Sequence, residues 1–351
     1  MTIEIVDAIA PIAREWDALV ERVGGPPYMR AGWVESWCAA FAARPAILCL
    51  RRAGRLAGVL PMRRDRGGLS TLTNAQTPGY ALLAEDADVQ CSIGRALFAG
   101  RVRVVQLAYF DASDPALGRL ESAARESAYR VLRSTIQHSP FVALDRGRDG
   151  PDAHLGAKHA SNLRRLRRRL EREGAVEIEV SDGGRRLDAL LAEGIRLEAS
   201  GWKAARGTAI ASRRDTQRFY VRLANWARDA GLLRLAFLRL DGRGLAFQLA
   251  LQDRFAYYFL KGGYDPEAAR LAPGKLLAHE MLGRAAADGL ARFEFLGAAE
   301  PWKLEWTRDC HERVRVQAFA PTPLGAIDLL AQSGYRRYAK PLAKRTVARR
   351  R

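Results

Sequence analysis

Hydrophobic and polar residues change their period several times along the chain, most clearly between Phe255 and Trp306. The run FAYYFL is aromatic and apolar, which predicts a buried strand. The next segment, GGYDPEAARLAPG, holds three Gly and two Pro and predicts an irregular loop. KLLAHEMLGRAAADG is apolar near the helical period, and ARFEFLG predicts a second strand. The stretch therefore predicts a strand–helix–strand unit, and such units are usually parallel and right-handed.

The start of this predicted helix is a candidate anion site. Pro273-Gly274 follows the first strand and opens the helix, where free backbone N–H groups and the helix dipole converge. An ordinary helix start in a structural crossover explains the pattern equally well, since helix N-termini far outnumber phosphate sites.

Elsewhere the pattern predicts two halves joined by a polar, Gly-rich linker at 146–157. The N-terminal half shows helical spacing at 9–20, 31–43 and 117–128, with short strands between 48 and 110 and at 141–145. The C-terminal half shows helical spacing at 158–172, 187–199 and 216–230, a three-strand meander at 232–265, and a late strand at 312–320. We expect an N-terminal domain over 1–150, a C-terminal domain over 151–323 and a basic helical tail over 324–351.

Two segments share one plan. Residues 48–62 and 235–251 each read as a strand, a turn in which Gly is followed by Arg, and a second strand. The likeness indicates an internal duplication. Two generic hairpins explain it equally well.

The net charge of +18 indicates an anionic partner. Arg outnumbers Lys by 50 to 7 and Ala, Gly and Leu are abundant, so part of the basicity reflects a GC-rich genome. Coenzyme phosphates, an anionic membrane surface and tRNA all suit the charge. The basic helix 158–172 and the tail 336–351 are the candidate contacts, and a solvated helix face is the alternative.

Several classes of protein are not indicated. The N-terminus lacks the pattern of a signal peptide, no apolar run approaches the roughly 18 residues of a membrane helix, and we expect a cytoplasmic protein. The four Cys and five His show no metal-ligand spacing, so no metal is expected. The phosphate-binding, dinucleotide-binding and serine-nucleophile motifs are missing. A transferase whose substrate amine attacks directly needs no nucleophile of its own.

Four phrases in this order resemble the FemAB/CelD-like group of GNAT-type acyltransferases: SNLRRLRRRLEREG, EASGWKAARGTAI, GGYDPEAARLAPGKLL and FEFLGAAEPWKLEW. The resemblance covers about 155–320 well and the N-terminal half more loosely. It implies an α/β (α+β) fold of tandem GNAT-like domains, the first degenerate, each a mixed, splayed sheet flanked by helices.

The resemblance also implies a donor site. In GNAT enzymes the loop between strand and helix holds the pyrophosphate of coenzyme A, which corresponds here to Ala272, Pro273, Gly274, Lys275 and Leu276. This loop keeps only one Gly of the usual pattern. Fem-type relatives use aminoacyl-tRNA as donor, and CelD-like members are associated with polysaccharide biosynthesis.

We therefore expect an N-acyltransferase that moves an acyl group from acyl-CoA to an amine of a small or sugar-linked acceptor, with a role in polysaccharide or cell-envelope biosynthesis. The candidate bases are Asp265, Glu294 and Glu300, and Tyr264 or Tyr258 protonates the leaving thiolate. The substrate-binding candidates are Trp202, Lys203, Arg206, Lys261, Trp302 and Lys303. Trp202 has an alternative role as an anchor of its loop.

Two other functions fit the sequence. One is a Fem-type aminoacyltransferase dependent on aminoacyl-tRNA, although the sustained heptads of the coiled-coil arm in such relatives are absent. The other is a non-catalytic basic protein that binds nucleic acid or a membrane through 158–172 and 336–351.

Overall fold

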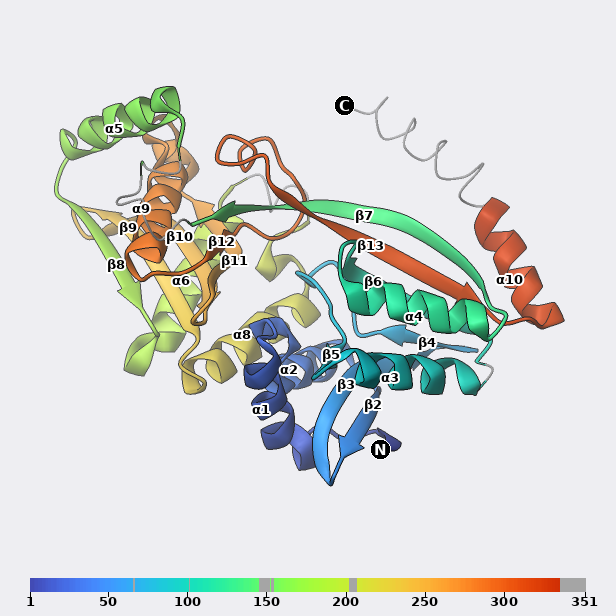
Figure 1. Cartoon of the computed structure of the whole chain (residues 1–351). Coiled ribbons are helices and arrows are strands. Elements are labelled where there is room, and N and C mark those ends of the chain that lie inside the picture. The colour runs from blue at the N-terminus through green and yellow to red at the C-terminus, as the bar shows by residue number, and fades with distance from the viewer. Residues whose placement is uncertain (66, 101, 145–151, 153–154, 202–206, 335–351) are drawn as a thin grey trace. The chain divides into compact units, whose positions relative to one another are not determined.

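The computed structural model describes residues 1–65, 67–100, 102–144, 152, 155–201 and 207–334 (Figure 1). The chain forms two compact units. Unit 1 comprises Met1–Ala31, Arg44–Ile136 and Arg313–Arg351, and unit 2 comprises Gly32–Ala43 and Gln137–Glu312. The domain limits expected near 150 and 323 stay a prediction.

The sheet of unit 1 is mixed. Its strands lie in the order β1 (Thr2–Val6), β2 (Pro45–Arg52), β3 (Arg55–Asp65), β4 (Gly68–Thr71), β6 (Val104–Asp111) and β13 (Cys310–Phe319), with β5 (Leu83–Ala84) beside β3. Only β4 and β6 are parallel among these pairs. The helices are α1 (Ala13–Val23), α3 (Ala87–Ala99), α4 (Pro115–Glu126) and α10 (Pro323–Gly334), with short 3-10 turns at Ala10–Ile12 and Pro27–Met29.

The sheet of unit 2 follows the same plan. Its order is β8 (Val176–Ser181), β9 (Leu233–Leu240), β10 (Arg243–Gln252), β11 (Ala256–Tyr264), β12 (Arg292–Glu294) and the end of β7 (Arg130–Ala143). Here β11 and β12 are the parallel pair, as the strand–helix–strand pattern predicts. The helices are α2 (Ala31–Phe41), α5 (Ala157–Glu171), α6 (Leu187–Ala199), α8 (Arg214–Asp229) and α9 (Pro273–Ala287), with 3-10 turns at Gly184–Arg186, Ile210–Ser212 and Pro266–Leu271.

The two sheets arise from the same succession of elements. Apart from the two-residue strand β5, which lies between β4 and α3, the order β1-α1-α2-β2-β3-β4-α3-β6 matches β8-α6-α8-β9-β10-β11-α9-β12, with the parallel pair at the same place. The fifth strand of each series, β6 or β12, is then flanked by an antiparallel strand. The expected α/β fold with tandem, similar sheets flanked by helices is confirmed.

The hairpins β2–β3 and β9–β10 are alike even in the positions of their turn and bulge residues. In the first hairpin, the turn residues Ala53 and Gly54 have φ of 51° and 78°. In the second, Asp241 and Gly242 have φ of 49° and 79°. Positive φ at both positions is the type I′ geometry that suits the twist of a hairpin. In each hairpin the third residue of the second strand, Ala57 or Leu245, is an extra residue that forms a bulge. A generic hairpin does not require a bulge at the same offset, so the internal duplication is the better explanation.

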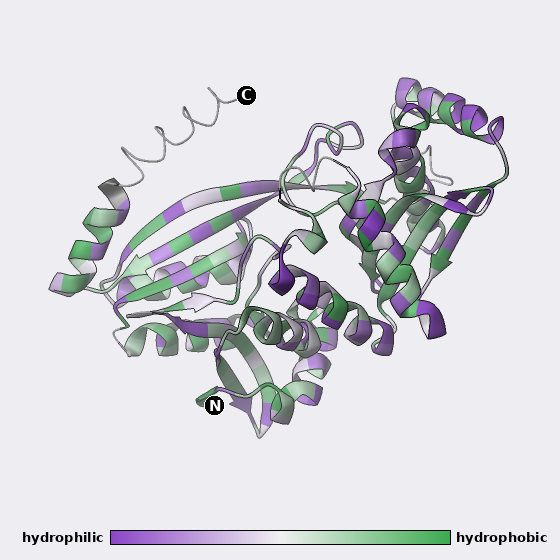
Figure 2. Cartoon of the chain, turned by 180° about the vertical axis from the view of Figure 1, so that it is seen from behind, coloured by the Kyte–Doolittle hydropathy of each residue, from purple (hydrophilic) through white to green (hydrophobic). Residues whose placement is uncertain are grey.

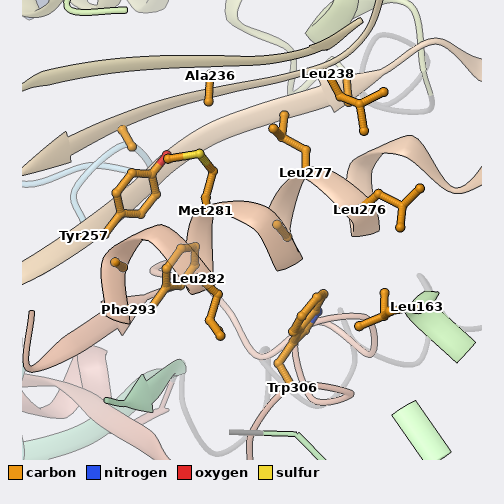
Figure 3. Close-up of a cluster of buried hydrophobic side chains, with 14 of the residues drawn as sticks. Leu163, Ala236, Leu238, Tyr257, Leu276, Leu277, Met281, Leu282, Phe293 and Trp306 are labelled. Carbon is orange, nitrogen blue, oxygen red and sulfur yellow. The ribbon is translucent and has the colours of Figure 1, made fainter. Parts of the chain in front are cut away.

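The core of unit 2 lies between α9 and the sheet. Leu277 and Met281 of α9 point toward Ala236, Leu238 and Tyr257 of the strands (Figure 3), and all five are at most 2% exposed. Burying a Leu or Met side chain contributes about 1.5–3 kcal/mol. The other face of the same strands packs on α6, where Gly194 lets the helix approach Phe247: a Cβ at Gly194 would lie 2.3 Å from that ring. Both helices are thereby fixed against β10 and β11.

The sheet of unit 2 splays at β11. Its parallel pairing with β12 covers only Ala256–Tyr258 on one strand and Arg292–Glu294 on the other. Beyond Tyr258, β11 runs on to Tyr264 paired with β10 alone among the described strands. The extra residue Leu260 bulges the strand at that point, because Leu249 pairs with Lys261 and Ala250 with Phe259. The divergence opens the sheet between the end of α6 and the start of α9.

No helix among the described residues is long and apolar enough to cross a membrane.

Candidate functional site in the splayed sheet of unit 2

A cavity of about 300 Å³ lies where β11 leaves β12. Its walls come from the end of α6, from β10 and β11, from the start of α9 and from the loop after β12. The lining residues on which the argument depends are Glu198, Gln248, Phe259, Gly263, Tyr264, Gly274, Lys275, Glu300 and Trp302. Mostly apolar walls with a few polar groups are typical of small-molecule sites.

Gly262 and Gly263 shape this cavity. They continue strand β11, so the irregular loop expected at this position is wrong for its first residues. A Cβ at Gly263 would lie 2.4 Å from the Glu198 Cα and 2.6 Å from the Leu197 carbonyl oxygen. Gly263 is thus needed for close approach of the α6 backbone rather than for a turn, whereas a Cβ at Gly262 would lie 2.7 Å from the Phe247 carbonyl oxygen of the neighbouring strand. This approach brings the end of α6 to the cavity.

Glu198 is the functional candidate that the sequence reasoning missed. It is 1% exposed and lines the cavity, and its Oε2 accepts a hydrogen bond of 2.8 Å from the Ile210 N–H. A fully buried carboxylate is rare and costly unless it is paired or hydrogen-bonded. One signal was available: Glu198 lies three residues after Ile195, on the buried face of α6.

Tyr220 of α8 lies close to this carboxylate. Burial, and after it the negative charge of Glu198, raises the pKa of the Tyr220 phenol, which therefore stays protonated. The ammonium group of Lys261 lies 5.5 Å from the centre of the Tyr220 ring. Lys261, one of the expected substrate-binding residues, is thus placed against Tyr220 and is not among the cavity-lining residues.

Three of the residues expected in catalysis and substrate binding lie on the cavity wall. Tyr264 is 39% exposed at the end of β11, and Glu300 and Trp302 come from the loop after β12. The Trp302 Nε1–H donates a hydrogen bond of 3.0 Å to Glu300 Oε2, which orients both side chains. Tyr264 also lies beside Gly274, whose added Cβ would be 3.3 Å from the Tyr264 ring.

The other expected catalytic residues are engaged away from the cavity. Asp265 caps the 3-10 turn by accepting from the Glu267 N–H at 3.0 Å, and it pairs with Arg243. Glu294 lies 3.2 Å from His311 Nε2. The Tyr258 hydroxyl donates to Asp253 at 3.2 Å. Their proposed roles receive no support from these positions.

Lys303 is buried and binds the loop after β12. It is 7% exposed, and its ammonium group donates to the carbonyl oxygens of Leu296 and Ala298 at 2.8 and 3.1 Å and pairs with Glu300 at 3.3 Å. These contacts match the three N–H donors of a lysine. They hold the loop in which Leu296 and Gly297 both have positive φ.

Trp202, Lys203 and Arg206 lie outside the described residues. Gly201, the residue before them, lines the cavity.

The start of α9 has few groups for an anion. Ala272 is the N-cap residue with φ of 52° and gives no side-chain cap. Pro273 has no N–H, and the N–H groups of Lys275 and Leu276 donate to the Ala272 carbonyl oxygen at 3.0 and 3.2 Å. Gly274 therefore supplies the amide that remains for an anion, together with the helix dipole and the ammonium of Lys275, which pairs with Glu305 at 2.6 Å.

The equivalent helix start in unit 1 is closed by the chain itself. Asp86 is the N-cap of α3, where its side chain accepts from the Val89 N–H at 3.0 Å and pairs with Arg52 at 2.6 Å. A carboxylate at this place repels a phosphate. Of the two helix starts, the α9 start has no side-chain cap, whereas the α3 start is capped by a carboxylate.

A second cavity of about 320 Å³ lies between α5 and α9. Arg164, Arg167 and Arg168 of the basic helix line it with Leu276 and His279 of α9. Arg164 pairs with Asp152 at 2.6 Å and Arg167 with Glu171 at 2.7 Å. Figure 2 shows α5 coloured mainly hydrophilic.

Within the described part of the chain, no group of three or more His, Cys, Asp or Glu side chains is arranged to hold a metal ion.

Comparison with known proteins identifies the unit that holds the cavity. Residues 157–304 match the family model described as an acetyltransferase (GNAT) domain. A search of the curated proteins finds no match.

Solved structures share the fold at low identity. A conserved protein of unknown function from Bacteroides thetaiotaomicron VPI-5482 is 12% identical with a TM-score of 0.63, covering 91% of this chain and 100% of that one. FemX is 13% identical with a TM-score of 0.62, covering 93% and 99%. The C-terminal domain of a candidate lysylphosphatidylglycerol synthetase from Agrobacterium fabrum is 12% identical with a TM-score of 0.58, covering 93% and 98%. The chain therefore carries a GNAT acetyltransferase domain in residues 157–304 and has the fold of the FemAB-like GNAT proteins.

Proposed function

We propose that unit 2 transfers an acyl group from acyl-CoA to the amine of a small or sugar-linked acceptor. The observation that carries this proposal is the cavity in the splayed sheet, which meets the uncapped start of α9 at Gly274 and Lys275. A phosphate of the donor binds at that helix start, and the thioester extends into the apolar cavity that Phe259 and Trp302 line. The GNAT domain match supports the reaction class.

The residues at the start of α9 leave room for a phosphate-bearing donor but offer few groups to bind its phosphate. Gly274 leaves room beside Tyr264 for a ligand to approach the backbone. With one available amide and one lysine, however, the site binds phosphate less strongly than a glycine-rich loop would. We expect the affinity for the donor to depend on the apolar cavity as well.

The chemistry follows from two groups that line the cavity, the Glu198 carboxyl group and the Tyr264 hydroxyl. The acceptor amine attacks the thioester carbonyl, the C–N bond forms, and the C–S bond breaks as the tetrahedral intermediate collapses. Glu198 takes the proton that the amine loses, and the Tyr264 hydroxyl gives a proton to the leaving thiolate. The products are an N-acyl amide and a free thiol. Glu300, hydrogen-bonded to Trp302, is the alternative base.

A pair of substitutions at Ala272 tests the donor site. Asp and Asn both tolerate the positive φ of this position, so Ala272→Asp and Ala272→Asn differ in charge alone. The added carboxylate copies the closed helix start of unit 1. We expect Ala272→Asp to weaken acetyl-CoA binding by roughly tenfold or more relative to Ala272→Asn, measured by isothermal titration calorimetry.

Two results would contradict the proposal. One is wild-type protein that binds neither coenzyme A nor acetyl-CoA at millimolar concentration. The other is equal affinity of the Asp and Asn variants, which would place the phosphates elsewhere.

A second candidate function, transfer from aminoacyl-tRNA, is favoured by the Arg-lined cavity between α5 and α9. The resemblance to Fem-type enzymes implies this donor, and the arginines would contact the RNA backbone. We expect a salt-sensitive mobility shift with charged tRNA that is lost when Arg164, Arg167 and Arg168 are replaced by Gln. A shift that survives the triple replacement would rule out this contact.

A further inference from the structure

Helix α10 of unit 1 presents an apolar face to solvent. Leu324, Ile327 and Leu330 are 58%, 60% and 72% exposed, and their spacing of three residues places them along one stripe. Leu330 is the most exposed large apolar side chain among the described residues. Between Pro323 and Gln332, where exposure is described, the remaining exposed positions are Pro323, Ala326 and Ala331, and none of them carries a charge. Figure 2 shows the hydrophobic colouring on α10.

The opposite face of α10 is fixed to unit 1. Asp328 pairs with Arg103 at 2.8 Å, and the Gln332 side chain donates to Gln317 at 3.2 Å. Gly325 packs so closely that a Cβ there would lie 2.2 Å from the Ala320 carbonyl oxygen. Because these contacts set the rotation of the helix, the three apolar side chains cannot turn inward without breaking them.

The sequence that follows α10 is strongly basic. Residues 335–351 read YRRYAKPLAKRTVARRR and hold eight Lys or Arg and no acidic residue. This segment thus supplies eight of the net 18 positive charges of the chain. An exposed apolar helix face joined to a cationic segment combines the two attractions that hold proteins at a bilayer surface, burial among acyl chains and attraction to anionic lipid.

We propose that the apolar face of α10 binds the surface of an anionic lipid bilayer. The three apolar side chains enter the interface. Residues 335–351 lie outside the described residues, and their sequence adds the positive charge that attracts anionic lipid. The apolar stripe favours a bilayer over a nucleic acid, which offers no apolar surface to a helix face. The charge favours a bilayer over a second copy of this chain, because a second copy would bring two cationic segments together. The proposal does not depend on the proposed acyl transfer.

Vesicle co-sedimentation of the full chain tests this surface. We expect binding to vesicles that contain phosphatidylglycerol, and at least roughly tenfold weaker binding to vesicles of phosphatidylcholine alone. The triple variant Leu324→Gln, Ile327→Gln, Leu330→Gln should lose binding by a similar factor. The matched control is Ile3→Gln with Ile5→Gln, which removes apolar side chains that are 37% and 52% exposed on β1 and should bind as wild type. An unchanged melting temperature of both variants shows that they fold.

Four outcomes would overturn the proposal. Equal binding to both kinds of vesicle would show that anionic lipid is not required. Binding of the triple variant with wild-type affinity would show that the apolar face of α10 does not contact the bilayer. A change from dimer to monomer in the triple variant, measured by light scattering, would assign the face to a second copy. Release of the protein from the vesicles by tRNA, together with a mobility shift of the tRNA, would assign the basic segment to nucleic acid.

Discussion

At the scale of single residues, the site depends on the carboxyl group of Glu198, which occupies a position on the buried face of α6 where an apolar side chain is usual. Glu198 continues the buried face of α6, and its carboxylate sits at the cavity instead of in solvent. Unsupported charges at such positions are strongly destabilising, so a buried carboxylate beside a cavity is a candidate for chemistry.

Replacing Glu198 by Gln tests that role. The amide keeps the shape and can still accept the hydrogen bond from the Ile210 N–H, but it cannot take a proton. We expect kcat to fall by about 10²- to 10⁴-fold with little change in the affinity for the donor. Steady-state kinetics and calorimetry on the same variant separate the two. Glu300→Gln is the matched control, and a larger loss there than at Glu198 would make Glu300 the base.

For Lys303 we expect a substitution to affect stability rather than catalysis. The Lys303→Met variant leaves the buried carbonyl oxygens of Leu296 and Ala298 without their donor. We expect the free energy of unfolding to fall by about 1–3 kcal/mol, measured by denaturant titration. If stability were unchanged and KM rose instead, Lys303 would contact a ligand, as expected from the sequence.

At the scale of elements, the contact between α6 and β11 decides where the cavity lies. Gly263 permits backbone contact that any side chain would prevent. The same residues look like a turn in the sequence because Gly-Gly is typical of turns. Only the neighbouring helix shows that Gly263 is there for close packing.

The Gly263→Ala variant tests this contact. Its Cβ would meet the backbone of Leu197 and Glu198, which cannot move aside as a side chain can. We expect a loss of about 1–3 kcal/mol in the free energy of unfolding, together with reduced ligand binding. Gly118→Ala in α4 is the control, because nothing lies within 4 Å of its added Cβ. That variant should be more stable by up to about 1 kcal/mol.

At the scale of the whole molecule, each unit takes a segment from the other part of the sequence. Residues 32–43 belong to unit 2, where Trp33 packs edge-on against Phe219 at 5.3 Å between ring centres. The end of β7 pairs with β12 of unit 2, whereas β13 pairs with β6 of unit 1. The chain therefore crosses between the units more than once.

This crossing predicts the behaviour of fragments. A fragment of residues 151–323 lacks α2 and the end of β7, which leaves Phe219 and the edge of β12 exposed. We expect it to aggregate or to lack a cooperative melting transition in circular dichroism, while the full chain melts cooperatively. A fragment that melts like the full chain would show that these contacts contribute little, and would support a domain boundary near 150.

The sequence by itself determined the elements, because they follow from local periodicity. The helix α9, the parallel strands on either side of it and the two hairpins are all visible in the spacing of apolar residues and in Ala53-Gly54 and Asp241-Gly242. The family resemblance predicted a donor loop at residues 272–276, of which Ala272, Pro273, Gly274 and Lys275 line the cavity. Only the tertiary structure decided which carboxylates reach that cavity. Asp265 and Glu294 lie near it in sequence but are engaged elsewhere, whereas Glu198 arrives from a distant helix. The physical reason is that burial and partners depend on packing between α6 and β11, which no local pattern encodes.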